Sequence, residues 1–289
     1  MLRWFFCPDG ALVEIAQCLE QCRMERRCAR LPYLRACQAR EWTGVPSTTQ
    51  LLNGTMMEYL KIVCDYGIAP KSRAYAMLGT LHHRTLEEYA SVGEITEQRF
   101  RNDVNSGQCD ILEPCEGGYV LGDYKTWGSF RVQRALGLVA EKIDDPSGAV
   151  YEKSGKWGKA GTPKQVNIWM PQPLVADLWE VELQLNSYRL LAESAGFPVV
   201  RMEIQVTVRD GATWLAHSRG VTEPLYLIPV DFLLDDDVRR YFGEKAIALN
   251  QALVHGWTEA CSAQECWNGR RCTQYCDVAH LCTVRVEES

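Results

Sequence analysis

The sequence lacks any run of apolar residues long enough to span a bilayer, for which about 20 are needed. Its first ten residues, MLRWFFCPDG, also lack the long apolar segment of an export signal. We therefore expect an unexported, intracellular protein of the cytoplasm that does not contact a membrane.

An excess of positive charge is missing too. The 31 lysine and arginine residues are outnumbered by 37 aspartate and glutamate residues, which gives a net charge of -6. This balance excludes a protein coated in positive potential, so any contact with nucleic acid must come from local basic patches. The chain does have the length and apolar content for a real core: 289 residues, 46% of them hydrophobic, suffice for one large domain or two small ones.

Cysteine is abundant, and its spacing is repeated. The count of 13 is odd and the residues are clustered, which favours metal binding over a disulfide framework. Two groups of four share the pattern C-x10-C-x3-C-x5-C: Cys7, Cys18, Cys22 and Cys28 near the N-terminus, and Cys261, Cys272, Cys276 and Cys282 near the C-terminus. Each group has enough thiolates for a tetrahedral zinc site or an iron-sulfur cluster.

The remaining cysteines fit neither group. Cys266 is a possible substitute for Cys261. The other four, namely Cys37, Cys64, Cys109 and Cys115, are expected to be core residues.

A predicted β-hairpin places two carboxylates close together. The segments before and after Gly117 and Gly118 have strand composition, and the glycines suit a tight turn. In this hairpin Asp110 on one strand comes near Asp123 on the other, beside Lys125. Paired carboxylates suit a hard cation such as Mg²⁺, and a lysine can orient an attacking water or offset charge on phosphorus. This is the chemistry of phosphodiester hydrolysis, although a solvated surface ion pair is the common alternative.

Two predicted helices place further polar residues on one face. The helix predicted over 74–92 carries His83 and Glu87 four residues apart, where they can add an imidazole and a carboxylate to a metal site. The helix predicted over 174–195 carries Gln184 and Tyr188 at the same spacing. A strand over 199–208 and an amphipathic helix from Asp235 to about His255 are expected to follow.

The segment 127–172 reads as irregular and rich in glycine and lysine. So long a loop is uncommon without a role. Its lysines predict an insertion that follows a nucleic-acid backbone, with a plain flexible loop as the alternative. They are Lys153, Lys156, Lys159 and Lys164, placed around Trp157.

Taken in chain order, these predicted helices and strands with their polar residues resemble the RecB-type branch of the PD-(D/E)XK nuclease superfamily. The matches, spread over roughly residues 45–285, are Gly79 to His83 for its G-x-x-x-H motif, Gly107 to Asp110 for G-x-x-D, Asp123 to Thr126 for D-x-K-T, and Gln184 to Tyr188 for Q-x-x-x-Y. The segment 127–172 is an unmatched insertion.

The resemblance implies an α/β protein with a restriction-endonuclease-like core, a central mixed sheet flanked by helices, and Cys-rich metal-binding segments at both termini. The expected organisation is a cysteine-rich segment at 1–43, a nuclease core at 44–256 with the insertion at 127–172, and a second cysteine-rich segment at 257–289.

The activity implied is that of a metal-dependent DNA nuclease, an exonuclease that hydrolyses phosphodiester bonds of single-stranded or end-processed DNA. By the resemblance, His83, Asp110, Asp123 and the backbone carbonyl of Tyr124 would bind Mg²⁺ or Mn²⁺. Lys125 would assist the attacking water, and the catalytic set would be completed by Gln184 and Tyr188, which contact DNA or order the site.

The C-terminal cysteines resemble those of iron-sulfur nucleases in this branch, including the CRISPR-associated RecB-like exonucleases. In that group one upstream cysteine joins three near the C-terminus to bind a [4Fe-4S] cluster. This chain departs from the pattern, because the gap between Cys272 and Cys276 is x3 rather than the usual x2 and a complete second set stands at the N-terminus. Two zinc sites, two iron-sulfur clusters and one site shared by both ends therefore remain open.

Two other classes of function compete with the nuclease. One is a non-catalytic, metal-stapled DNA-binding module of the same fold, and the other is a zinc-ribbon scaffold for a protein partner. The complete set of His83, Asp110, Asp123 and Lys125 favours the enzyme. DNA is the expected partner, and protein partners in DNA processing are unknown.

Overall fold

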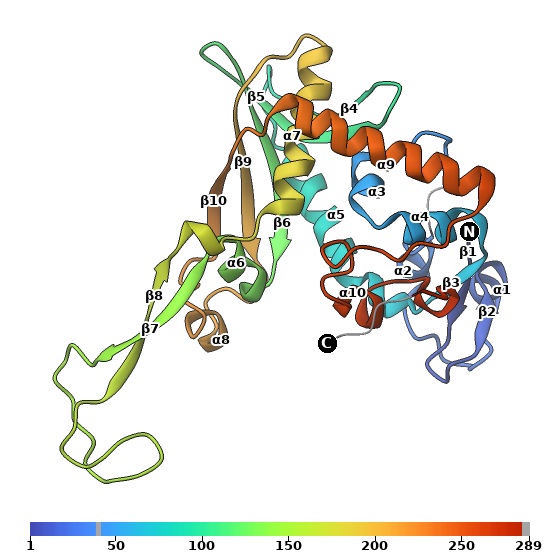
Figure 1. The fold of residues 1–289 in the computed structure, drawn as a ribbon. Helices are drawn as coiled ribbons and strands as arrows, with labels where there is room; N and C mark the ends of the chain where they lie inside the picture. The colour runs from blue at the N-terminus through green and yellow to red at the C-terminus, as the bar shows by residue number, and fades with distance from the viewer. Residues whose placement is uncertain (39–41, 285–289) are drawn as a thin grey trace. The chain divides into compact units, whose positions relative to one another are not determined.

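The chain is a mixed α/β protein with several sheets flanked by helices (Figure 1). Its structure is a computed structural model that describes residues 1–38 and 42–284. It divides into two compact units, the first made of Met1–Gly122, Glu180–Met202 and Asp231–Ser289, and the second of Asp123–Trp179 and Glu203–Val230. The ends of the two predicted cysteine-rich segments, at 39–41 and 285–289, lie outside the described residues.

The helices of the first unit are mostly short. They are α1 (Ile15–Glu20), α2 (Leu31–Ala36), α3 (Thr48–Leu52), α4 (Thr55–Val63), η1 (Pro70–Arg73), α5 (Ala74–Glu87), α7 (Trp179–Ser194), α9 (Asp235–His255), α10 (Arg270–Gln274) and η3 (Ala279–Leu281). The acidic first turn expected for α9 is present, where Asp235, Asp236 and Asp237 suit the positive end of the helix dipole.

A small three-stranded sheet forms in the first unit. Its strands are β1 (Leu2–Phe6), β2 (Leu12–Glu14) and β3 (Tyr66–Ile68), with β1 between the other two. Because β1 pairs antiparallel with β2 and parallel with β3, this sheet is mixed.

A larger sheet has the strand order β10-β9-β6-β5-β4. Its strands are β4 (Ile95–Arg101), β5 (Ser106–Cys115), β6 (Gly118–Trp127), β9 (Val199–Val208) and β10 (Leu225–Val230), and both β6 and β9 contribute residues to each unit.

The predicted hairpin between β5 and β6 is confirmed. Its antiparallel register runs from Ile111 opposite Gly122 to Cys115 opposite Gly118. The two residues left in the turn are Glu116 and Gly117, and Gly117 has a φ of +85°, which glycine adopts without the steric cost that other residues meet.

Both ends of the chain pack on one core in the first unit. Phe5 and Cys18 from the N-terminal segment and Val278 from the C-terminal segment are buried together with Met56 and Leu60 of α4. Three cysteines of the C-terminal set pack against this core, and so does Cys7. The cysteine-rich segments are therefore integral to the first unit and not appendages to it.

The second unit holds the remaining elements. They are α6 (Ser129–Ala135), β7 (Leu138–Asp144), β8 (Gln165–Pro171), η2 (Pro173–Val175), α8 (Trp214–His217) and the second-unit residues of β6, β9 and β10. The start of α6 is fixed by Asp210, whose carboxylate accepts hydrogen bonds from the backbone N–H and the hydroxyl of Ser129, each at 2.6 Å. Val132 on α6 and the nearby Val221 are fully buried in this unit.

Three sequence predictions are wrong in detail. The helix predicted over 74–92 ends at Glu87, because the following residues bond to carbonyls three positions back and Gly93 has a φ of +104°. The helix predicted over 174–195 begins at Trp179, since the preceding chain forms the short turn η2 and is extended at Ala176. Cys115 is exposed at the end of β5, whereas Cys37 and Cys109 are buried as expected.

The segment 127–172 is not irregular. It contains α6 and a long antiparallel ribbon in which β7 and β8 pair from Leu138 opposite Pro171 to Asp144 opposite Gln165. The two strands are separated by a glycine-rich stretch, and this separation hides their pairing from a reading of local composition. None of the helices in the described part of the chain is long and apolar enough to cross a membrane.

Candidate metal centre

Three side chains of the first unit meet in one cluster. His83 comes from α5, Glu97 from β4 and Asp110 from β5, and one ligand atom of each lies within 4.8 Å of the others. His83 Nδ1 is 3.4 Å from Asp110 Oδ1 and 3.9 Å from Glu97 Oε1. An imidazole nitrogen and two carboxylate groups in this arrangement are a donor set for a divalent metal.

The register of the sheet brings the two carboxylates together. The pairs Thr96 with Ile111 and Gln98 with Cys109 flank Glu97 and Asp110, which therefore face one another on neighbouring strands. Like charges opposite each other destabilise a sheet. Glu97 also has a φ of +50°, a left-handed conformation that is unfavourable for a residue other than glycine. The chain thus holds this carboxylate in place against both charge and backbone preference.

The electrostatics of Glu97 reflect this position. Burial raises the pKa of its carboxyl group, and the neighbouring Asp110 raises it further, while His83 and a hydrogen bond from Gln108 act in the opposite direction. Gln108 Nε2 donates to Glu97 Oε2, and Arg99 in turn donates to Gln108 Oε1. A carboxylate oriented by an outer partner in this way is typical of a metal ligand.

Asp123 and Lys125 form an ion pair in the second unit. Lys125 Nζ lies 2.6 Å from Asp123 Oδ2, and the side chains are 19% and 4% exposed, respectively. Residues two apart on a strand share a face, and this places both on the same side of β6. Asp123 is buried and Lys125 is partly buried, so the pair is not fully solvated. The predicted approach of Asp110 to Asp123, and the predicted role of the Tyr124 carbonyl, stay predictions.

Gln184 and Tyr188 interact as their spacing predicts. Gln184 Nε2 donates to the Tyr188 hydroxyl at 2.9 Å along one face of α7. The ring of Tyr188 packs against Gly107, where a Cβ atom would lie 2.5 Å from Tyr188 Cδ1. The absence of a side chain at Gly107 therefore makes room for the Tyr188 ring, and the segments that carry these two residues pack against each other.

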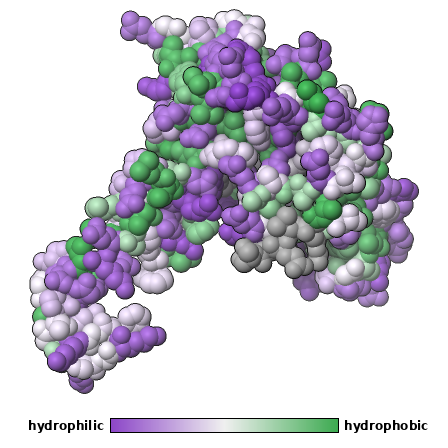
Figure 2. All heavy atoms as spheres, in the orientation of Figure 1, coloured by the Kyte–Doolittle hydropathy of each residue, from purple (hydrophilic) through white to green (hydrophobic). Residues whose placement is uncertain are grey.

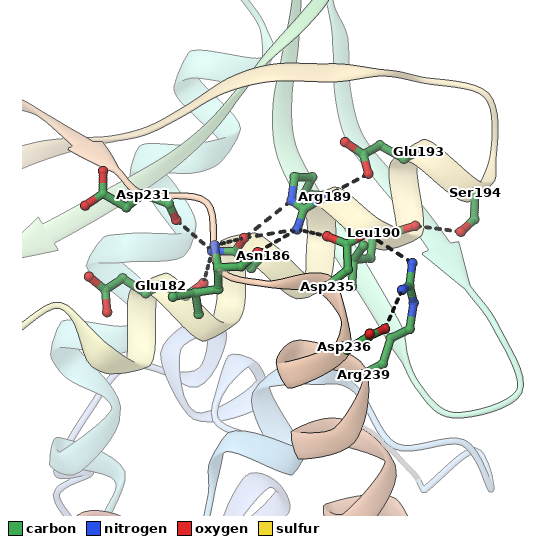
Figure 3. Close-up of polar contacts among 11 residues, drawn as sticks. Glu182, Asn186, Arg189, Leu190, Glu193, Ser194, Asp231, Asp235, Asp236 and Arg239 are labelled. Atoms are coloured by element: carbon green, nitrogen blue, oxygen red, sulfur yellow. Dashed lines mark hydrogen bonds and ion pairs between the residues drawn. The ribbon is translucent and has the colours of Figure 1, made fainter.

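Polar contacts tie α7 to the chain that leads into α9 (Figure 3). Arg189 donates to the carboxylate of Asp235 at 2.6 Å and to that of Glu193 at 3.1 Å. Asn186 Nδ2 donates to the backbone carbonyl of Asp231 at 2.9 Å, and Asn186 Oδ1 accepts from Leu233 N–H at 3.0 Å. These bonds fix the helix that carries Gln184 and Tyr188.

A second buried polar cluster lies in the same unit. Asn105 Nδ2 donates to Thr48 Oγ1 and to Ser187 Oγ, both at 2.9 Å, and the two hydroxyls are 3.0 Å apart. These three residues are almost completely buried. They carry no formal charge and bond to one another, which indicates a structural role. The preceding Ser47 caps α3 in a capping box with Gln50.

The N-terminal cysteines surround one loop. Burial raises the pKa of Cys18, and Cys7, Cys28 and Cys22 raise it further, so all four belong to one neighbourhood. Arg27 donates to the carbonyls of Leu19 and Glu20 at the end of α1. Arg23 pairs with Asp9, which joins the turn after Cys7 to the loop that carries Cys22.

The C-terminal cysteines are more deeply packed. Burial raises the pKa of Cys261 to about 11, opposed by a hydrogen bond from Met57 N–H, and Cys272 and Cys282 raise it as well. Burial likewise raises the pKa of Cys276, opposed by the Val278 N–H. Cys261 lies against Gly54, where a Cβ atom would be only 2.1 Å from its sulfur. Cys266 instead accepts a bond from Gly269 N–H at 3.3 Å in its own turn.

Within the described residues, the side chains that lie close enough to share one metal ion are His83, Glu97 and Asp110, and this group includes no cysteine. The two cysteine sets stay predicted metal sites, with zinc and iron-sulfur both open.

The structure can be compared with the predictions for Glu87 and for the four lysines. Glu87, which could have added a carboxylate to a metal site, is exposed and is not a member of the cluster, although its charge also raises the pKa of Glu97. The second carboxylate of the cluster is Glu97, which the sequence analysis did not identify. The only local signal for Glu97 is a carboxylate within the strand that precedes β5. The four predicted nucleic-acid-binding lysines all lie in the loop between β7 and β8 of the second unit.

Comparison with known proteins adds little. No protein-family model matches the chain, and no curated protein matches it. A solved structure titled "Crystal structure of SSO0001" is similar with a TM-score of 0.44 and 13% sequence identity, over 87% of this chain and 92% of that chain. This similarity is too low to assign a fold family or a function.

Proposed function

We propose that this protein is a divalent-metal-dependent deoxyribonuclease of the PD-(D/E)XK type, an exonuclease acting on single-stranded or end-processed DNA. The observation that carries the proposal is the cluster of His83, Glu97 and Asp110, in which two carboxylates face each other beside an imidazole. Such repulsion is offset when a cation binds between the groups.

The donor set fits Mg²⁺ or Mn²⁺. Carboxylate oxygens suit both ions, and the imidazole favours Mn²⁺. By the resemblance to the PD-(D/E)XK nucleases, Asp123 and the Tyr124 carbonyl would be further ligands of this ion.

The chain's own residues have distinct tasks in the proposed reaction. A divalent ion bound here supplies a polarised phosphoryl oxygen and a more acidic water. The ammonium group of Lys125, held 2.6 Å from Asp123, orients the attacking water and offsets the charge that develops on the phosphate. Gln184 and Tyr188, bonded to each other, order the site beside Gly107.

Cleavage of end-labelled single- and double-stranded DNA tests the proposal. With Mg²⁺ or Mn²⁺ the protein should shorten labelled strands from an end, and with EDTA it should not. Asp123→Asn should abolish cleavage, whereas Asp65→Asn, at an exposed position of the first unit, should cut like the wild-type protein. Binding without cleavage under every metal would overturn the enzyme and favour the non-catalytic DNA-binding module.

The two cysteine sets form two separate metal sites in this proposal, each closed by its own four residues. The support is that Cys18 interacts with all three other members of its set, and Cys261 with Cys272 and Cys282 of its own. Both sites would fasten the chain's ends to the common core and take no part in hydrolysis.

Gly54→Ala tests the C-terminal site without removing a ligand. A methyl group there overlaps the Cys261 sulfur and should displace it, so we expect loss of about half of the bound metal and a lower melting temperature. Gly243→Ala is the matched control, because nothing lies within 4 Å of its Cβ position in α9. Full metal content in Gly54→Ala would contradict a site at Cys261, and an absorption spectrum with metal analysis distinguishes iron-sulfur from zinc.

A further inference from the structure

The loop between β7 and β8 is the most basic stretch of the second unit. Between residues 145 and 164 it has four lysines, namely Lys153, Lys156, Lys159 and Lys164, against the carboxylates of Asp145 and Glu152. The whole chain carries a net charge of -6, so this local excess runs against its overall balance. Asp145 is also engaged locally, since its Oδ1 accepts Ser147 N–H at 2.9 Å.

This loop is ordered by its own backbone bonds. Asp145 N–H donates to the Lys164 carbonyl at 2.7 Å, and Lys164 N–H donates to the Ala149 carbonyl at 2.8 Å. Further along, Tyr151 N–H donates to the Thr162 carbonyl at 3.0 Å, and Gly161 N–H returns a bond to the Tyr151 carbonyl at 2.9 Å. The ribbon of β7 and β8 is thereby extended towards a defined tip.

The tip presents one cation and one aromatic ring. Gly155 and Gly158 exchange two backbone hydrogen bonds of 2.9 and 3.3 Å, which leaves Lys156 and Trp157 as the two central residues of a tight turn. The ring of Tyr151 packs under this turn, because a Cβ atom at Gly158 would lie 2.3 Å from Tyr151 Cε2. Trp157 is 79% exposed, with Lys156 Nζ 5.5 Å from its ring centroid.

Trp157 thus offers an exposed indole face on a turn with a defined backbone conformation. The other large aromatic side chain of the loop, Tyr151, packs against the turn and supports it. Gly155 has no atom within 4 Å of its Cβ position, which leaves the backbone open to close approach. An aromatic face beside lysines is the combination that binds single-stranded nucleic acid, where the ring stacks on a base and the cations contact phosphates.

We infer that the Lys156–Trp157 turn is a stacking contact for an unpaired base of single-stranded DNA, and that Lys153, Lys159 and Lys164 contact phosphates of the same strand. This inference rests on the proposed function and deepens it, because it assigns a preference for unpaired substrate to a named surface. Stacking on an indole is possible for every base, so the contact selects unpaired strands without selecting a sequence.

The surroundings of Trp157 fit a nucleobase better than a membrane. Its neighbours from Ser154 to Ala160 are glycine, lysine, serine and alanine, which offer no further large apolar side chain to enter a bilayer. Figure 2 shows hydrophobic side chains on the visible face of the β7–β8 ribbon, with mostly hydrophilic ones on the loop beyond it. A single ring of this size matches one base.

Binding of labelled oligothymidylate to the full-length protein in EDTA tests the inference, since EDTA prevents cleavage. Trp157→Ala should weaken binding of the single strand by about 5- to 150-fold, the range for loss of one stacked base. Trp157→Phe should restore most of it, because the ring face is retained. Trp214→Ala is the matched control, as that indole is 82% exposed on α8 of the same unit, and it should stay within about twofold of wild type.

The lysines are tested by salt dependence. Replacing Lys153, Lys159 and Lys164 with glutamine should reduce the slope of log affinity against log salt by about 2, because each phosphate contact on a single strand contributes about 0.7. Trp157→Ala should leave that slope unchanged. An unchanged slope in the three-lysine variant would overturn the phosphate contacts.

Different experimental outcomes would contradict this inference and the proposed nuclease function. If the wild-type protein cuts DNA and Trp157→Ala binds the single strand as tightly as wild type does, the turn is not a stacking contact and the nuclease stands. If the wild-type protein never cuts but Trp157→Ala loses single-strand binding, the stacking contact stands and the nuclease falls. Cosedimentation with phosphatidylserine vesicles that depends on Trp157, without an effect on oligothymidylate, would overturn the inference in favour of a membrane.

Discussion

Two polar clusters of the first unit, one buried and one partly exposed, differ in the charge of their groups. In the cluster of Thr48, Asn105 and Ser187, each side chain bonds to the other two at 2.9 to 3.0 Å and none is charged. In the cluster of His83, Glu97 and Asp110, two carboxylates face each other, and the pKa of Glu97 is raised by burial and by Asp110. The first arrangement consists of neutral groups that bond to one another, whereas the second brings like charges together, which the cation of the proposed site would offset.

This difference between the clusters leads to different expectations for their roles. A self-satisfied cluster stabilises the fold, because every buried donor and acceptor has a partner. A cluster of like charges costs folding free energy and is expected to persist only where binding or catalysis requires it. Variants that remove one group from each cluster should therefore have opposite effects on stability and activity.

The largest effect is expected from Asp110→Asn. If Asp110 binds the metal directly, as the proposed function requires, its loss should reduce cleavage by more than the ~10–100-fold seen for outer-shell partners. The melting temperature in EDTA should not fall, because one of two facing charges is removed. Cleavage rates with Mn²⁺ and thermal unfolding in EDTA measure the two effects, and a stable variant that cuts at the wild-type rate would remove Asp110 from the site.

An intermediate effect of the opposite kind is expected from Asn105→Ala. The change leaves two buried hydroxyls without their amide donor and should destabilise the protein by about 1–3 kcal/mol. Activity per folded molecule should be unchanged, since Asn105 belongs to the self-satisfied cluster. Urea unfolding gives the free energy, and a loss of activity without a loss of stability would place Asn105 with the functional group instead.

How much of the fold and of the candidate site the sequence could predict depends on how far apart in the chain the contacting residues lie. The β5–β6 hairpin and the Gln184–Tyr188 bond follow from local spacing, and both are present. Glu97 joins the site through the register between β4 and β5, which local pattern does not determine. Glu87 was favoured because it shares a helix face with His83, yet it lies exposed.

The ribbon of β7 and β8 was missed for the same reason. Its strands pair across a stretch rich in glycine and lysine, whose composition is typical of a loop. The contact between Gly54 and Cys261 joins residues far apart in sequence, and only the packing of both chain ends on one core reveals it. The repeated cysteine spacing was visible in the sequence, but the unequal burial of the two sets was not.

The smallest effect, and the sharpest test of the comparison, is expected from Glu97→Gln. Relief of the cross-strand repulsion should stabilise the metal-free protein by about 0.2–1 kcal/mol, while Gln108 can still donate to the new amide oxygen. Because the pKa of Glu97 is raised in the folded state, the wild-type protein loses stability as the pH rises through that pKa. The variant should therefore be more stable than wild type at pH values above the folded-state pKa of Glu97, and equally stable at pH values below it.

Thermal unfolding in EDTA across pH measures this difference, with the exposed Glu113→Gln as control. Added Mn²⁺ should stabilise the variant less than it stabilises the wild-type protein. A Glu97→Gln protein that is less stable at every pH would show that Glu97 belongs with the structural cluster.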